Sequence, residues 1–202
     1  MTVQGARSHG FLLEACQVSY FQHLITQENG GDGLYCRGCN GASFTHLTAQ
    51  DNQGHGIRLA GWQWVNAKGS LERYSGGAYL SVFSSESNMG DGVNVAPGNL
   101  VPADQVTGAS IRDGWLESNC GDGINISAPN TLVDGLRIVD YEHDGRAVRV
   151  RATGLGAVVR GIRSSGNGNY SDHFNRILVE MDANSSDMFS FEGNFNMYDV
   201  SA

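Results

Sequence analysis

The chain has 202 residues and a formal net charge of −8 at neutral pH, with 28 Gly and only 3 Pro. The acidic balance argues against a nucleic-acid backbone as ligand. No apolar run approaches the roughly 20 residues that a membrane-spanning helix needs, and no signal peptide opens the chain, so we expect no membrane insertion.

One short motif recurs along the chain, namely Asn-x-Gly-Asp-Gly followed by two spaced aliphatic residues. Its clearest copies begin at Asn29, Asn52 (with His in place of Asp), Asn88 and Asn119. Two weaker copies lie at the ends of this series. The final glycine of each copy stands at position 10, 33, 56, 92, 123 or 145, at intervals of 23, 23, 36, 31 and 22 residues. A basic period of 22–23 residues with two enlarged members indicates an internal repeat.

Each copy is expected to build two or three short strands. The residues one and three places after the glycine are apolar: Phe11/Leu13, Leu34/Cys36, Ile57/Leu59, Val93/Val95 and Ile124/Ile126. This alternation is typical of a strand with one buried face, and a second apolar set precedes each Asn. Because such short strands are unstable alone, the copies must stack about 4.8 Å apart in parallel sheets. The sequence therefore predicts an all-β, right-handed parallel β-helix of about six to seven coils.

The first two coils, about residues 8 to 53, are regular and contain most of the cysteines. They predict that Phe21 stacks on Phe44 and that His23 stacks on His46, an arrangement common in solenoids. Cys36 and Cys39 form a C-x-x-C with no second pair, which argues against a metal site, and we predict no cofactor. Cys16 and Cys39 occupy equivalent positions, so a disulfide between them is an alternative to buried thiols, the favoured interpretation.

Two polar columns are expected at the turn between coils. The turn asparagines should form a ladder, because Asn satisfies turn amides and tolerates left-handed backbone. The acidic column before the glycines contains Asp32, Asp91, Asp122 and Asp144, with His9 and His55 as substitutes. Turn formation is the favoured interpretation of this column, and calcium binding or acid catalysis is the alternative.

The two enlarged coils are lengthened after the same strand, within residues 61–77 and 97–108. Because both insertions leave adjacent coils at the same corner, we expect them to project side by side as a lip. Loops on a rigid scaffold are where binding residues concentrate. The first carries the predicted substrate-binding residues Trp62, Trp64, Lys68, Arg73 and Tyr74. Aromatic side chains of this kind suit the apolar face of a sugar ring.

The strands beside the lip supply candidate acid–base residues. Stacked outward carboxylates begin about 4.8 Å apart and splay, so they can meet the separation of about 5–5.5 Å that a retaining glycosidase requires or the 6.5–9.5 Å of an inverting one. Two pairs qualify as catalytic: Asp113 with Asp134, and Glu86 with Glu117. Arg112 and Arg160 are predicted to bind an acidic sugar, which in a lyase would allow a neighbouring base to remove the α-proton.

The repeated Gly-[Ile/Leu/Val]-x-[Ile/Leu/Val] after Asn-x-Gly-Asp-Gly resembles the right-handed β-helix of the pectate-lyase superfamily, over residues 8 to about 167. Within it, the short Gly-rich coils look most like a phage tailspike or tail-appendage domain. This resemblance implies a homotrimer, located in the virion or outside the cell, that binds and cleaves a bacterial surface polysaccharide as hydrolase or lyase. The alternative is a non-catalytic receptor-binding or structural module.

After Asn167 the repeat dissolves into a segment rich in Asn, Ser, Asp and aromatic residues. We therefore expect coils over residues 1–170, and a last coil with a cap that seals the core over residues 171–202. No capping segment precedes the first coil, so we expect either a longer parent chain or a partner that covers this end.

Overall fold

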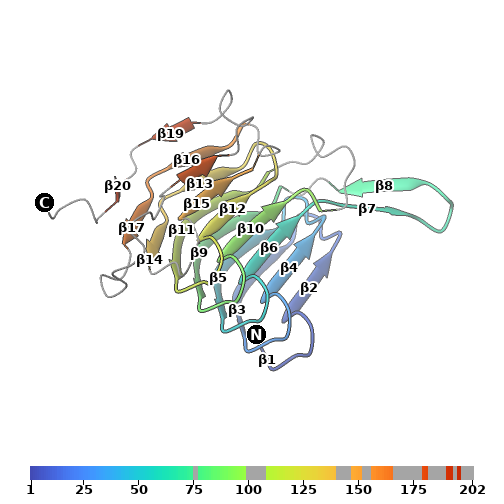
Figure 1. Ribbon diagram of the computed structural model, residues 1–202. Coiled ribbons are helices and arrows are strands. Elements are labelled where there is room, and N and C mark those ends of the chain that lie inside the picture. The colour runs from blue at the N-terminus through green and yellow to red at the C-terminus, as the bar shows by residue number, and fades with distance from the viewer. Residues whose placement is uncertain are drawn as a thin grey trace, which may run out of the picture.

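The computed structural model describes residues 1–74, 77–98, 108–139, 147–151, 156–165, 179–181, 190–192 and 195–196. These residues form strands and turns, and they contain no helix long and apolar enough to cross a membrane. The strands pair mainly in two parallel sheets, which run side by side along the molecule (Figure 1).

Within the described residues, the first sheet has seven strands in the order β18-β15-β12-β10-β6-β4-β2. Its strands are β2 (Phe11–Glu14), β4 (Leu34–Arg37), β6 (Ile57–Ala60), β10 (Val93–Ala96), β12 (Ile124–Ile126), β15 (Val148–Val150) and β18 (Val179–Met181). All of its pairings are parallel and join equivalent strands of successive coils.

In the part of the chain that the structure describes, the second sheet has eleven strands. They are β1 (Thr2–Gln4), β3 (Tyr20–Gln27), β5 (Ser43–Gln50), β9 (Tyr79–Glu86), β11 (Ser110–Glu117), β13 (Leu132–Asp134), β14 (Arg137–Val139), β16 (Val158–Arg160), β17 (Arg163–Ser165), β19 (Ser190–Glu192) and β20 (Phe195–Asn196). The parallel β-helix predicted from the repeat is confirmed, whereas the number of coils and the boundary near residue 170 stay predictions.

The eleven-stranded sheet is bent along its length. In the middle of β3, β5, β9 and β11 stands a residue with positive φ: His23 (53°), His46 (56°), Val82 (49°) and Asp113 (52°). In the next two coils the equivalent residues are Gly135 and Gly161, with φ of 67° and 66°. There the strand divides, into β13 with β14 and into β16 with β17. A left-handed residue interrupts the alternation of side chains, so two successive residues face outward at the bend.

The core lies between the sheets and has the predicted register. Phe11, Leu34, Ile57, Val93 and Ile124 are paired in turn along the seven-stranded sheet. The last four of these side chains are 0% exposed. The predicted stack of Phe21 on Phe44 is also confirmed, with ring centroids 5.0 Å apart.

The turn asparagines form the predicted ladder. Asn29 Nδ2 donates to Asn52 Oδ1 (2.8 Å), Asn52 Nδ2 to Asn88 Oδ1 (2.9 Å), and Asn88 Nδ2 to Asn119 Oδ1 (2.9 Å). Each Oδ1 also accepts the backbone N–H of the preceding Asn. These side chains are at most 2% exposed, so the ladder is a buried hydrogen-bond chain across four coils.

The first insertion forms an antiparallel hairpin of β7 (Trp62–Val65) and β8 (Leu71–Tyr74), which extends away from the coils (Figure 1). It leaves the seven-stranded sheet after β6 and returns to the other sheet at β9. Residues 99–107 of the second insertion lie outside the described residues, so the paired lip stays a prediction.

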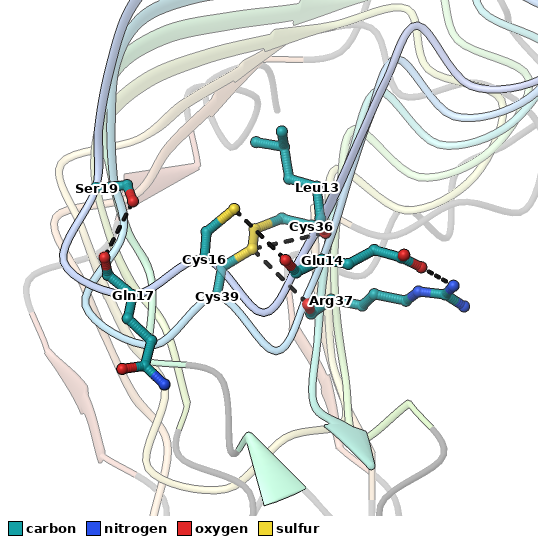
Figure 2. Close-up of a disulfide and its surroundings, with 8 residues drawn as sticks. All are labelled: Leu13, Glu14, Cys16, Gln17, Ser19, Cys36, Arg37 and Cys39. Atoms are coloured by element: carbon teal, nitrogen blue, oxygen red, sulfur yellow. Dashed lines mark hydrogen bonds and ion pairs between the residues drawn. A yellow bond between two sulfur atoms is a disulfide. The ribbon is translucent and has the colours of Figure 1, made fainter. Parts of the chain in front are cut away.

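The favoured interpretation of the cysteines as buried thiols is wrong for one pair. Cys36 and Cys39 form a disulfide, with Cα atoms 6.0 Å apart, because the turn after β4 brings the two side chains together. Cys16, on the turn of the preceding coil, is free and is therefore not bonded to Cys39 (Figure 2). Cys120 is likewise not part of a disulfide.

We predict that the ladder is a main source of stability. Asn52→Ala removes the acceptor of both the Asn29 side chain and its backbone N–H. Each buried group left unpaired costs about 1–3 kcal/mol, so the urea midpoint should fall clearly. Asn40→Ala, at an exposed turn position, is the matched control and should change stability by less than about 0.5 kcal/mol. Equal midpoints for the two variants would contradict a structural role for the ladder.

We also predict two alkylatable thiols in the unreduced, unfolded chain and four after reduction, counted by mass spectrometry with iodoacetamide. In the folded chain, burial raises the pKa of the Cys16 thiol, because it disfavours the thiolate. Cys16 should therefore react more slowly at pH 8 than in the unfolded chain, and the difference should shrink as the pH rises through its raised pKa. A Cys16→Ser variant identifies its label, and an identical rate in both states would refute the effect of burial.

Candidate functional site

The outer face of the seven-stranded sheet carries two columns of side chains. Alternation along each strand turns the middle residue of the repeat outward, and the register aligns these residues in successive coils. The first column is Leu12, Tyr35, Arg58, Asn94, Asn125 and Arg149. The second begins with Glu14, Arg37, Ala60 and Ala96.

Aromatic rings and guanidinium groups meet on this face. The Arg58 guanidinium carbon lies 4.8 Å from the centre of the Tyr35 ring. The Arg37 carbon lies 5.9 Å from the same ring and 4.9 Å from the Trp62 ring. Since Trp62 begins β7, the hairpin contributes an aromatic side chain to this face. We call Tyr35, Arg37, Arg58 and Trp62 the arginine–aromatic cluster.

Neighbouring groups orient the cluster. Arg37 forms an ion pair with Glu14 of the preceding coil (Figure 2). Arg58 Nη1 lies 3.9 Å from Asp32 Oδ2, and the His9 ring meets the Tyr35 ring edge-on at 5.1 Å. The side chains of Arg37 and Arg58 are still 33% and 34% exposed, which leaves part of each guanidinium open to a ligand.

The acidic column at the edge of this face has the predicted turn role. Asp32 Oδ1 accepts the backbone N–H of His55 (2.8 Å), and Asp91 Oδ1 accepts that of Asp122 (2.9 Å). Where His replaces Asp, Nδ1 accepts instead: His9 from Asp32 N (3.0 Å) and His55 from Asp91 N (2.9 Å). An Asp oxygen and a neutral His nitrogen are thus interchangeable acceptors here. Asp144 lies outside the described residues.

The remaining carboxylate oxygens of this column reach the outer face. Asn94 Nδ2 donates to Asp91 Oδ2 (2.8 Å), and Asn125 Nδ2 donates to Asp122 Oδ2 (3.3 Å). Arg149 Nη1 lies 3.4 Å from the same Asp122 oxygen. The column therefore holds the amides and guanidinium groups of the face in place, as well as closing the turns.

The sequence-predicted binding residues of the hairpin have different positions. Trp62 joins the cluster, and Lys68 is exposed at the hairpin turn, where its backbone N–H donates to Asn66 Oδ1 (2.9 Å). Trp64, Arg73 and Tyr74 lie in the paired hairpin strands, and their side chains are outside the described part.

The other predicted residues lie on the eleven-stranded sheet. Arg112, Asp134 and Arg160 are register partners in successive coils, and Arg160 Nε and Nη2 donate to Asp134 Oδ2 (3.0 and 2.9 Å). Asp113 is exposed at the bend, one position out of register with Asp134. Their use as a catalytic pair stays a prediction.

The second predicted carboxylate pair is stacked as expected. Glu117 is the register partner of Glu86. Each accepts a hydrogen bond from its own strand: Ser84 Oγ donates to Glu86, and Trp115 Nε1 donates to Glu117 Oε2 (2.7 Å). Their catalytic role is likewise a prediction.

Sequence reasoning missed Tyr35, Arg37 and Arg58. Two of them occupy the middle position of the repeat, which is free to vary and therefore gives no periodic signal. One signal could have found them: the middle position points outward in every coil, and adjacent coils place an aromatic residue (Tyr35) next to a basic one (Arg58) there.

No family model matches the chain, and no curated protein matches it. Among solved structures it is similar to the A-modules of the Azotobacter vinelandii mannuronan C-5 epimerases AlgE6 (TM-score 0.72, 14% identity) and AlgE4 (TM-score 0.73, 13% identity), each over 96% of this chain. It is also similar to the periplasmic alginate epimerase AlgG (TM-score 0.63, 13% identity, 94% of this chain). The chain spans 52%, 51% and 47% of those three chains, about half of each. At this identity the likeness establishes the right-handed parallel β-helix fold.

We predict that His55 acts as a hydrogen-bond acceptor. His55→Ala leaves the buried N–H of Asp91 without its partner and should cost about 1–3 kcal/mol in urea unfolding. His55→Asn keeps an acceptor at a similar position and should recover most of that loss. If both variants lose the same stability, the ring packing of His55 matters and its Nδ1 does not.

Proposed function

We propose that this chain binds an acidic polysaccharide along the outer face of its seven-stranded sheet. The observation that carries the proposal is the arginine–aromatic cluster, in which Arg37 and Arg58 both approach the Tyr35 ring and Arg37 also approaches the Trp62 ring. Guanidinium groups form strong paired hydrogen bonds with carboxylates, and aromatic rings suit the apolar face of a sugar. The similar solved proteins are named for mannuronan and alginate, which are polymers of uronic acids.

The columns also suit a polymer. Outward positions repeat about every 4.8 Å along the axis, so a chain lying along the sheet would meet equivalent positions in successive coils. The Asn and Arg side chains held by Asp91 and Asp122 extend the polar surface beyond the cluster. We therefore expect several sugar units to contact the face at once.

We further propose that the bound uronate is chemically changed at the carbon next to its carboxylate. Arg37 and Arg58 would neutralise the carboxylate, which makes the adjacent proton easier to remove. Tyr35, within the cluster, and His9, whose ring meets the Tyr35 ring edge-on, are groups able to transfer a proton. Return of a proton to the opposite face gives an epimer, whereas loss of the C4–O leaving group gives a cleaved chain with a C4–C5 double bond.

A second candidate function is hydrolysis at Glu86 and Glu117. It is favoured by their stacking in register, because a retaining glycosidase needs two carboxyl groups about 5–5.5 Å apart. This activity would release a new reducing end without a double bond, so product analysis separates it from proton abstraction.

The setting we propose is a phage tailspike or another extracellular protein acting on a bacterial surface polysaccharide, as a homotrimer. The Cys36–Cys39 disulfide supports a site of action outside a reducing cytoplasm. Tyr20 and Tyr79, with exposures of 77% and 56%, are outward apolar positions that a trimer could bury. Sedimentation as a monomer at micromolar concentration would contradict the trimer.

We predict that Arg58→Gln weakens binding of hexamannuronate by about 10–100-fold in calorimetric titration, the range for losing one hydrogen bond to a charged group. Binding to the parent chain should also weaken as salt is added. Arg163→Gln removes an exposed arginine from β17 of the eleven-stranded sheet and is the control. Equal losses in both variants would indicate a general charge effect and contradict a site at Arg58.

The products of a long incubation with polymannuronate test the chemistry separately from binding. New ultraviolet absorbance would indicate elimination, a changed anomeric NMR spectrum with intact length would indicate epimerisation, and reducing ends alone would indicate hydrolysis. Binding without any product would support the non-catalytic module and contradict both catalytic proposals.

A further inference from the structure

The bend of the eleven-stranded sheet forms a groove on the molecule. It has a volume of about 530 Å³ and crosses β3, β5, β9 and β11. One side is formed by the left-handed residues His23, His46, Val82 and Asp113, and the other by Ile25, Thr48, Ser84 and Trp115. Small-molecule sites in proteins have volumes of about 300–1,000 Å³. Three coil steps separate His23 from Asp113, about 14 Å at 4.8 Å per step, so the groove is elongated along the axis.

Trp115 stands at one end of this groove with a fixed orientation. Its Nε1 donates to Glu117 Oε2 (2.7 Å), and the Arg137 guanidinium of the next coil lies over the ring at 4.5 Å. On the preceding coil its register partner is Ser84, and Thr48 follows in the coil before that. Because these side chains are small, the ring face opposite Arg137 overlooks the groove.

Polar groups line the rest of the groove. Asp113 presents an exposed carboxylate, and Thr48 and Ser84 contribute hydroxyl groups. The His23 and His46 rings stack at 4.8 Å, as the repeat predicted, and His46 Nδ1 lies 3.2 Å from Thr45 Oγ1. An aromatic ring with donors and acceptors around it is the arrangement that a sugar ring requires.

The charges distinguish this groove from the arginine–aromatic cluster. Asp113 lines it, and the carboxylates of Glu86 and Glu117 follow Ser84 and Trp115 on the same strands. The nearby Arg137 covers the far face of Trp115. The acidic side chains in and beside the groove therefore favour a neutral ligand over a uronate, which the cluster would attract.

We propose that the groove binds a neutral saccharide segment, with a pyranose ring stacked on the open face of Trp115. Sugar hydroxyls would contact Asp113, Thr48 and Ser84, which lie within the same groove. The proposal stands on the groove itself and holds whether or not the seven-stranded sheet binds an acidic polysaccharide. A surface polysaccharide with neutral and acidic units would engage both faces.

The test is calorimetric titration of the full chain with two neutral probes, cellohexaose and maltohexaose, alongside tryptophan fluorescence. At least one probe should bind and perturb the fluorescence. Trp115→Ala should lower the affinity for that probe at least tenfold, whereas Trp115→Phe, which keeps a ring, should stay within about threefold. Arg58→Gln is the control on the other face and should leave this binding unchanged.

A second variant guards against misfolding of Trp115→Ala. Ser84→Phe keeps Trp115 but fills the groove beside it, so it should abolish probe binding while the melting temperature stays close to that of the parent chain. The proposal is overturned if neither probe binds, or if binding survives both Trp115→Ala and Ser84→Phe. Loss of binding in Arg58→Gln would assign the neutral sugar to the other face and also refute it.

Discussion

The buried asparagine ladder is the interaction on which the rest of the molecule depends. Asn29, Asn52, Asn88 and Asn119 are joined by side-chain hydrogen bonds of 2.8–2.9 Å, although 23, 36 and 31 residues separate them in sequence. A buried amide without partners is costly, so each coil is held in the one register that completes the chain of bonds. Coils of different length therefore align at the same corner, and the extra residues of a longer coil have to protrude from a different turn. The β7–β8 hairpin leaves after β6, away from the ladder.

The register has a direct consequence for both candidate sites. A slip by one residue would move every inward side chain to the surface, so the ladder also determines which side chains face outward together. Tyr35 and Arg58 become neighbours because adjacent coils are aligned, and so do His23 and His46. Each site is therefore assembled from one or two residues of each of several coils, with no contiguous sequence motif.

This explains what could be predicted from the sequence. A repeat reveals what its copies share, so it predicted the ladder, the core and the stacks of Phe21 on Phe44 and His23 on His46. The candidate binding residues Arg37 and Arg58 stand at positions where the copies differ, and for this reason they gave no signal. The bend was equally hidden, since only the glycines of the later coils suggest positive φ. The C-x-x-C disulfide was not predicted, because it depends on the conformation of the turn after β4, which the repeat spacing does not determine.

The bend itself shows how the scaffold accommodates unfavourable residues where a groove forms. Left-handed backbone is unfavourable for non-glycine residues by about 1–2 kcal/mol, and a β-branched residue such as Val82 is a marked outlier. The conformation persists because the flanking residues are held on both sides: Leu80 and Phe83 are buried, and the Phe83 ring occupies the space that a side chain at position 114 would need. Gly114 is thus required by packing and leaves Asp113 and Trp115 facing outward around it. The core accordingly fixes the bend, and the bend shapes the groove, while the outward residues remain free to determine what it binds.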